Sequence, residues 1–227
     1  MQRKNIHLVA ELCALAVIVL AIRLGAHIPA VANALASDKA LMAHWELWAA
    51  WAGWLIFSLY WEIAKEKTAA AKSAESPTSR GLHVFLANVA LLLVAAPIRG
   101  LGRFMPISSP VMAVGLVIEA MGLFVAIWAR RHLGRNWSGE ITIKVDHQLI
   151  RSGPYARLRH PIYTGLLAMY AGTVLVTGGW LALIGLAMAA LAYGRKLRLE
   201  EANMVVAFGA EYDHYRRESW ALVPGLF

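Results

Sequence analysis

The chain is poor in cysteine and in charge. Of its 227 residues only Cys13 is a cysteine, and Asp, Glu, Lys and Arg together make up 16%. A single cysteine excludes a disulfide scaffold and a zinc site built on cysteines. The low charge is combined with 59% apolar residues, whereas a soluble domain carries about 25% charged residues. We therefore expect a bilayer, not water, to surround most of the chain.

Other signatures are also absent. The sequence has no internal repeat, and no Gly-x-Gly-x-x-Gly turn follows a strand, which excludes a soluble-type dinucleotide fold. The formal charge is +8, but the basic residues lie between apolar runs and form no single stripe. We interpret this charge as membrane topology and contact with anionic headgroups, and we expect no nucleic-acid partner.

Long apolar runs make up most of the chain. Four of them lie at about 6–24, 43–63, 82–98 and 111–129. A fifth, at 162–194, is too long for one ~30 Å crossing at about 1.5 Å per residue, and Gly178-Gly179 interrupts it with a turn signal. The sequence therefore predicts an all-α integral membrane protein with about six transmembrane helices, four plus a C-terminal helical hairpin.

The loops between these runs predict the topology and a division of the chain. The first run follows Arg3 and Lys4, and we expect it to be retained as a membrane helix and not removed as a signal peptide. The basic residues of the loops then predict that both termini are cytoplasmic. The polar stretch at 65–80 is the clear linker. We place an N-terminal helix pair and linker at 1–80 and a core at 81–227.

Some residues within the expected spans are unusual for a membrane helix. Glu11, Asn88 and Glu119 are polar, and intramembrane carboxylates are functional candidates because burying them is costly. We favour interhelical hydrogen bonds for them. The run at 43–63 is rich in tryptophan, for which we favour packing and interfacial anchoring over ligand stacking.

The segment at 130–163 differs from the other loops because it is long, polar and rich in turns. A loop of about thirty residues in a small membrane protein is usually functional. It holds His132, His147 and His160, whose wide spacing does not favour a metal site. After the hairpin, residues 195–217 have the pattern of an amphipathic helix, in which Lys196 and Glu200, and Arg198 and Glu201, are spaced to meet.

Three motifs follow one another in this part of the chain. The loop has HxLIxSGPY at 147–155 and RHPxYxG at 159–165, and the C-terminal stretch has Glu200-Glu201 followed by FGxEYxxY at 208–215, with Pro224 near the end. In this fixed order they resemble the isoprenylcysteine carboxyl methyltransferase family of integral membrane enzymes. The first two helices show no such signature.

The resemblance implies methyl transfer from S-adenosylmethionine in a membrane-embedded pocket that opens to the cytosol, formed by the loop and the C-terminal helix. It places the cofactor contacts at Glu140, His147, Gln148, Leu149, Ile150, Tyr155, His160, Pro161, Ile162, Tyr163 and Glu200. At Glu140 the family commonly has an amide. The substrate-binding arginine of the family is Lys196 here, flanked by Arg195 and Arg198. Lysine keeps the charge but not the planar fork of donors, so this departure bears on a prenylcysteine carboxylate as substrate.

Several functions stay open at this point. The first is methyl transfer to an apolar or amphiphilic acceptor that enters from the bilayer. The second, in the same fold, is transfer to a phospholipid amine or a small thiol, which must lose a proton; His160, Glu200 and Glu201 are candidate bases. Sterol reductases look similar at their C-terminal end, so an NADPH-dependent reductase is the third. A non-enzymatic transporter or assembly factor would use Glu11 and Glu119 in a polar path.

Overall fold

The computed structural model describes residues 38–65, 71–74, 76–97, 100–137, 142–144 and 148–225. Within them the elements are α3 (Lys39–Met42), α4 (Trp45–Lys65), β1 (Ala71–Ala74), α5 (Pro77–Ala95), α6 (Ser109–Leu133), η1 (Gly134–Asn136), β2 (Thr142–Lys144), η2 (Gly153–Ala156), α7 (Pro161–Thr177), α8 (Trp180–Phe208) and α9 (Ala210–Glu218). The helix expected at about 6–24, with Glu11, lies outside the described residues.

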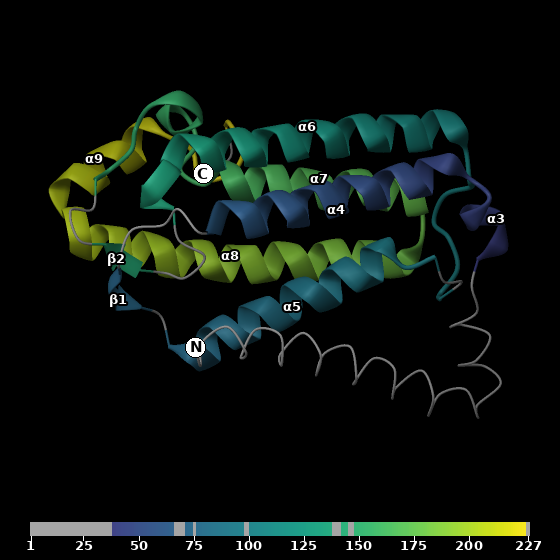
Figure 1. Cartoon of the computed structure of the whole chain (residues 1–227), viewed down its shortest axis with the longest axis horizontal. Helices are drawn as coiled ribbons and strands as arrows, with labels where there is room; N and C mark the ends of the chain where they lie inside the picture. Colours follow the sequence, from purple (N-terminus) through teal and green to yellow (C-terminus); the bar gives the residue numbers. More distant parts are fainter. Residues whose placement is uncertain are drawn as a thin grey trace.

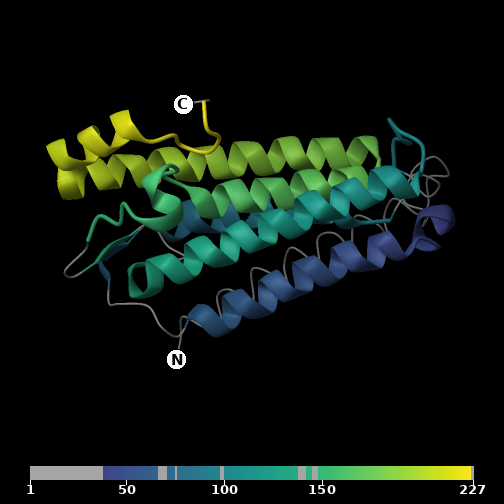
Figure 2. The same cartoon turned by 90° about the horizontal axis from the view of Figure 1, so that it is seen from above.

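In the described part of the chain five long helices form one bundle, in which α4, α6, α7 and α8 lie side by side (Figure 2). Figure 1 shows α9 and the short β1–β2 ladder at one end of the bundle and α3 at the other. Helices α5, α6 and α8 are long and apolar enough to cross a membrane, and α7 is a shorter apolar helix. Helix α4, which includes Glu46, Glu62 and Lys65, is not among these candidate spans of the described residues. The predicted helical membrane architecture is confirmed for these elements, while the count of six stays a prediction.

The hairpin is present, but its second half differs from the expectation. Gly178 ends α7 with a φ of +63°, which suits a residue without a side chain, and α8 begins at Trp180. We expected two short helices and a separate amphipathic helix at 195–217, and this was wrong. Because one glycine at 194 does not break a helix, α8 continues to Phe208, and the chain turns at Gly209, where φ is +51°.

The polar linker also differs from the expectation. Strand β1 lies inside the stretch that we assigned as linker and pairs antiparallel with β2 of the long loop. Neither strand has the alternating apolar pattern that signals a strand in a sequence, so the ladder was not predicted. It joins the segment before α5 to the loop that carries the first family motif, which bridges the division we placed at residue 80.

Glycines set the distance between α6 and α7. A Cβ atom at Gly122 would lie 2.4 Å from the Gly165 carbonyl oxygen, and one at Gly172 would lie 2.4 Å from the Gly115 carbonyl oxygen. Both contacts are too short for any side chain, so the two backbones touch at two levels, as small residues allow in membrane helices. This packing fixes the position in space of the first turn of α7 relative to α6.

The polar residues inside the bundle make hydrogen bonds. The indole Nε1 of Trp54 donates to the Thr173 hydroxyl at 2.9 Å, and Thr173 lies 3.0 Å from the buried carboxyl of Glu119. The Asn88 amide donates to the Val84 carbonyl of its own helix at 2.8 Å. Glu119 therefore makes the interhelical contact that we favoured, and Asn88 makes a local one. The exposed Trp45 and Trp48 suit an interfacial position.

An ion pair links two segments at the end of the bundle near α3. Arg103 contacts Asp38 at 2.8 Å and also donates to the Thr177 carbonyl. A hollow at this end is lined by these residues and by Leu93. Since Thr177 is the last residue of α7, this hollow and the start of α7 lie at opposite ends of the helix.

Candidate active site

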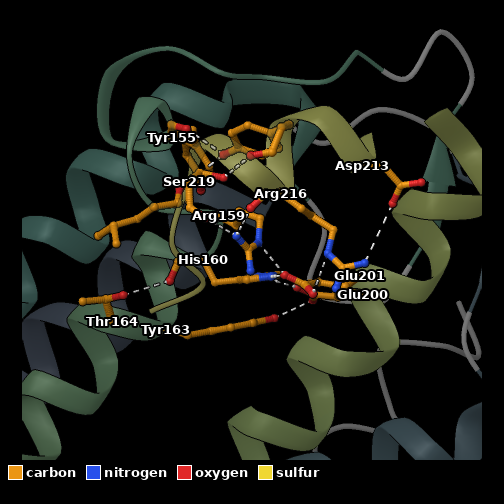
Figure 3. Close-up of polar contacts among 12 residues, drawn as sticks. Tyr155, Arg159, His160, Tyr163, Thr164, Glu200, Glu201, Asp213, Arg216 and Ser219 are labelled. Atoms are coloured by element: carbon orange, nitrogen blue, oxygen red, sulfur yellow. Dashed lines mark hydrogen bonds and ion pairs between the residues drawn. The ribbon is translucent and has the colours of Figure 1, made fainter. Parts of the chain in front are cut away.

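The start of α7 and the last turns of α8 meet because the two helices are antiparallel neighbours. Helix α7 has 17 residues, and the seventeenth residue of α8 is Lys196. At equal rise per residue, Lys196 therefore lies level with the start of α7, and Glu200 and Glu201 lie one turn further on. Figure 3 shows Arg159, His160 and Tyr163 pointing toward these two glutamates.

His160 lies between the two carboxylates. Its Nδ1 is 3.5 Å from Glu200 Oε2, and its Nε2 is 3.4 Å from Glu201 Oε1. Burial favours the neutral ring, but the hydrogen bonds and negative charges of both glutamates outweigh it and raise the pKa of His160. The imidazolium form, with both nitrogens as donors, fits this geometry.

Glu200 contacts tyrosine as well as histidine. The Tyr163 hydroxyl donates to Glu200 Oε1 at 2.5 Å. The ring of Tyr163 is parallel to that of His160, with centroids 5.6 Å apart, and 5.3 Å from the ring of Tyr193. Glu200 is thus a half-buried carboxylate beside aromatic faces, with Lys196 as a further neighbouring charge.

Glu201 is held by arginines from two other segments. Arg159 donates to its Oε1 at 2.6 Å, and Arg216 of α9 is 3.7 Å from its Oε2. Arg159 also donates to the Ser219 carbonyl. The expected pairing of Glu201 with Arg198 is absent from the ion pairs of the described residues, and Arg198 is exposed. Glu201 therefore joins α8, α9 and the segment before α7.

The C-terminal segment at 219–222 holds the chain that carries His160. The backbone nitrogens of Arg159 and His160 donate to the carbonyls of Trp220 and Ala221 at 2.8 and 3.1 Å. The Thr164 hydroxyl donates to the Leu222 carbonyl at 2.6 Å. These backbone contacts have no side-chain signature, so sequence reasoning missed them.

The Gly153-Pro154-Tyr155 turn is packed against α6. Gly153 has a φ of +58°, and a Cβ there would lie 2.7 Å from the His132 ring, so the turn and the ring approach too closely for a side chain. The buried Tyr155 follows, and its carbonyl accepts from the Tyr215 hydroxyl at 2.6 Å. Burial, and then the negative charge of Glu200, raises the pKa of Tyr155 well above its usual range.

The structure brings together most of the residues that the resemblance singled out. His160, Tyr163 and Glu200 are in contact, and Pro161 and Ile162 form the buried start of α7. Gln148 is exposed and Leu149 half-buried, while Ile150 packs against the main core. Glu140 and His147 lie outside the described residues. Among the described residues no group of three or more His, Cys, Asp or Glu is placed to hold a metal ion.

The two basic positions before Glu200 lie against α5. Lys196 is buried, and the Arg195 guanidinium donates to the Ser79 hydroxyl at 2.6 Å. Sequence reasoning named Arg195 and Lys196 but missed their neighbours on α5, Ser79 and His83. Their spacing of four residues on an apolar helix was the signal that could have found them.

A sequence model of the isoprenylcysteine carboxyl methyltransferase family matches residues 113–206. The match runs from within α6 to near the end of α8, so it includes the site residues on α7 and α8. Helices α4 and α5 precede it, and α9 follows it.

Curated proteins are also similar in sequence to part of this chain. The protein-S-isoprenylcysteine O-methyltransferase of Dictyostelium discoideum is 26% identical over 116 residues, 50% of this chain and 49% of that protein. The methanethiol S-methyltransferase 2 of Bradyrhizobium diazoefficiens is 39% identical over 74 residues, 32% of this chain and 27% of that protein. The matched part thus spans about half the length of these relatives or less.

One solved structure is also similar. It is that of a eukaryotic intramembrane Ras methyltransferase, an isoprenylcysteine carboxyl methyltransferase, which has a TM-score of 0.47 and 17% identity. The similarity covers 66% of this chain and 64% of that one.

Proposed function

We propose that this protein is an S-adenosylmethionine-dependent methyltransferase that acts on an apolar or amphiphilic acceptor entering from the membrane. The observation that carries the proposal is the cluster of His160, Tyr163 and Glu200, which lies inside the region that matches the family. The relative named for isoprenylcysteine and the relative named for methanethiol are both named as methyltransferases.

The residues present fit the proposed cofactor. Adenosylmethionine carries an ammonium, a carboxylate and a sulfonium, and when bound it supplies a methyl group to a nucleophile. The half-buried carboxylate of Glu200 suits the ammonium through a charge-assisted hydrogen bond. The buried Tyr155 and Tyr193 and the partly buried Tyr163 offer apolar and π surfaces for the adenine and the sulfonium. Lys196 and Arg195 supply positive charge for a carboxylate.

In this proposal the chain acts mainly by positioning. His160 orients Glu200 through its Nδ1 and is itself fixed by Glu201 and by the C-terminal segment. A nucleophile held in line with the methyl group, with water excluded, gains much of its acceleration from geometry. The buried Tyr155 and the partly buried Tyr163 contribute to that exclusion.

A small-thiol acceptor is a second candidate within the same activity. Lys196 stands where the family has its substrate-binding arginine, so the planar fork that reads a carboxylate is absent at this position. The relative with 39% identity is named for methanethiol. A phospholipid amine stays the other alternative.

Calorimetry separates the enzyme classes. Detergent-purified protein is titrated with adenosylmethionine and, in parallel, with NADPH. We expect binding of adenosylmethionine only. Binding of NADPH alone would contradict the methyltransferase and favour a sterol-reductase-like enzyme.

The proposed topology places the site and both termini in the cytosol. A single cysteine at Ser152, in a chain with Cys13→Ser, tests this by labelling intact cells with an impermeant maleimide. We expect labelling only after the cells are opened. Efficient labelling from outside would overturn the orientation.

A further inference from the structure

His83 on α5 is a buried histidine with a nitrogen that has no partner. The residue is 8% exposed, and its Nδ1 makes no hydrogen bond. The ring also lies beside the Ala192 backbone, and the neutral tautomer with its proton on Nε2 can donate to the carbonyl there. In this tautomer Nδ1 carries a lone pair and is an acceptor. A buried, unsatisfied acceptor of this kind requires an explanation.

The surroundings of His83 connect it to the proposed site. Its ring meets that of Tyr193 edge-on, with centroids 5.2 Å apart, and Tyr193 contacts Tyr163. Four ionisable groups of α8 face it, namely Lys196, Glu200, Arg195 and Tyr193. His83 thus extends the aromatic and charged cluster onto a helix outside the residues that match the family.

The other candidate bases are already paired with one another. His160 lies between Glu200 and Glu201, and Arg159 holds Glu201. A group in such a network is poorly placed to accept a further proton. His83 Nδ1 has no such partner, and it faces two cations that would stabilise an anion formed beside it.

A second unsatisfied nitrogen lies next to His83. Arg195 uses one terminal nitrogen on Ser79, and its other terminal nitrogen, Nη1, is buried without a partner. Ser79 is one helical turn before His83, so both face α8 from the same side of α5. A proton acceptor and a cationic donor thus occur together, an arrangement that suits a nucleophile which arrives neutral and becomes anionic.

We propose that His83 is the general base for methyl transfer to a thiol acceptor. The inference rests on the proposed function. As the S–H bond breaks, its proton passes to Nδ1, and the sulfur pair forms a bond to the methyl carbon. The bond from that carbon to the sulfonium breaks, and its electron pair stays on the cofactor sulfur, giving a thioether and the neutral cofactor product. His83 then returns the proton to water.

The test compares two thiols of different acidity. Ethanethiol is protonated at neutral pH, whereas thiophenol is largely ionised and needs no base. We expect His83→Asn to lower kcat for ethanethiol about 100-fold at pH 7, the range of general-base catalysis, and to leave thiophenol turnover within about threefold. The ethanethiol loss shrinks as the pH rises, because more of this thiol ionises by itself.

Controls separate this inference from the proposed function. His44→Asn, at the other end of the bundle, serves as the matched histidine variant and should keep both activities. If a His83 variant binds adenosylmethionine normally but loses turnover equally with both thiols, the assignment of His83 as the general base is overturned. The assignment is also overturned if the wild-type protein binds the cofactor but methylates only a prenylcysteine carboxylate. A wild-type protein that binds no adenosylmethionine refutes the proposed function itself.

A wild-type measurement covers the case in which His83→Asn does not bind the cofactor. Ethanethiol is protonated below about pH 10, so without a base its rate should fall about tenfold per pH unit from pH 9 to pH 7. Transfer of its proton to His83 predicts a much smaller fall over this range, in which thiophenol is already ionised. A fall of about tenfold per unit with ethanethiol would overturn the proposal.

Discussion

A buried carboxylate and a half-buried pair of carboxylates in this bundle differ in what surrounds them. Glu119, in the middle of α6, contacts a threonine, and its other oxygen has no hydrogen-bond partner. Glu200 and Glu201, near the end of α8, contact a histidine, a tyrosine and two arginines. Burial alone therefore does not mark a functional carboxylate here. What marks the functional carboxylates is a neighbouring charged group that can share a proton with them or hold them in place.

The largest expected effect is on the affinity for adenosylmethionine, which should depend on Glu200 and not on Glu119. Glu200→Gln removes a charge-assisted hydrogen bond, worth roughly 1.5–3 kcal/mol, so the Kd for adenosylmethionine should rise about 10- to 150-fold. The same change at Glu119 should leave it within twofold. Calorimetry on both purified variants measures this, and unchanged affinity in Glu200→Gln would remove its assigned role.

The ion cluster should also make stability depend on pH. The raised folded-state pKa of His160 means that its contribution is present below the unfolded value of about 6.5 and is lost as pH rises through the folded value. A tenfold higher proton affinity in the folded state corresponds to about 1.4 kcal/mol of stability. The stability gap between wild type and His160→Gln should therefore narrow from pH 6 to pH 9 in thermal unfolding. A gap that widens over this range would contradict the assignment.

A smaller effect is expected at Lys196. If the acceptor is a thiol or an amine, Lys196→Arg keeps the charge and should leave turnover unchanged or up to about threefold lower, because lysine already serves as a point charge. Turnover is measured with a prenylcysteine analogue and with ethanethiol. A clear rise with the prenylcysteine analogue would instead favour a carboxylate read by a guanidinium fork.

The smallest effect is expected for the stability of Glu119→Gln. The Thr173 hydroxyl lies 2.9 Å from the Met169 carbonyl and 3.0 Å from Glu119, but it has one proton. A glutamine amide can donate to Thr173 and leave that proton for Met169, so unfolding stability should change by less than about 1 kcal/mol. Loss of activity in this variant would favour a functional polar path through the bundle.

The sequence predicted the helices well because a bilayer imposes long apolar runs. The helices near 43–63, 82–98 and 111–129, and the turn at Gly178-Gly179, lie where hydropathy and glycine placed them. It failed where the signal was weak. Lys196 to Phe208 are polar enough to suggest a separate helix, yet α8 is continuous because nothing in that stretch breaks a helix. The β1–β2 ladder was missed because backbone pairing of four residues leaves no pattern.

For the candidate site, the sequence by itself determined which residue types are present and in what order, through the motifs around His160 and Glu200. Only the tertiary structure decided which of them touch. The close glycine packing of α6 on α7 and the antiparallel course of α8 bring Glu200 and Glu201 to His160. Packing of α5 on α8 brings His83 to Tyr193. One buried histidine in an apolar run carries no signal of its partner, because contacts between distant helices depend on distance in space and not along the chain.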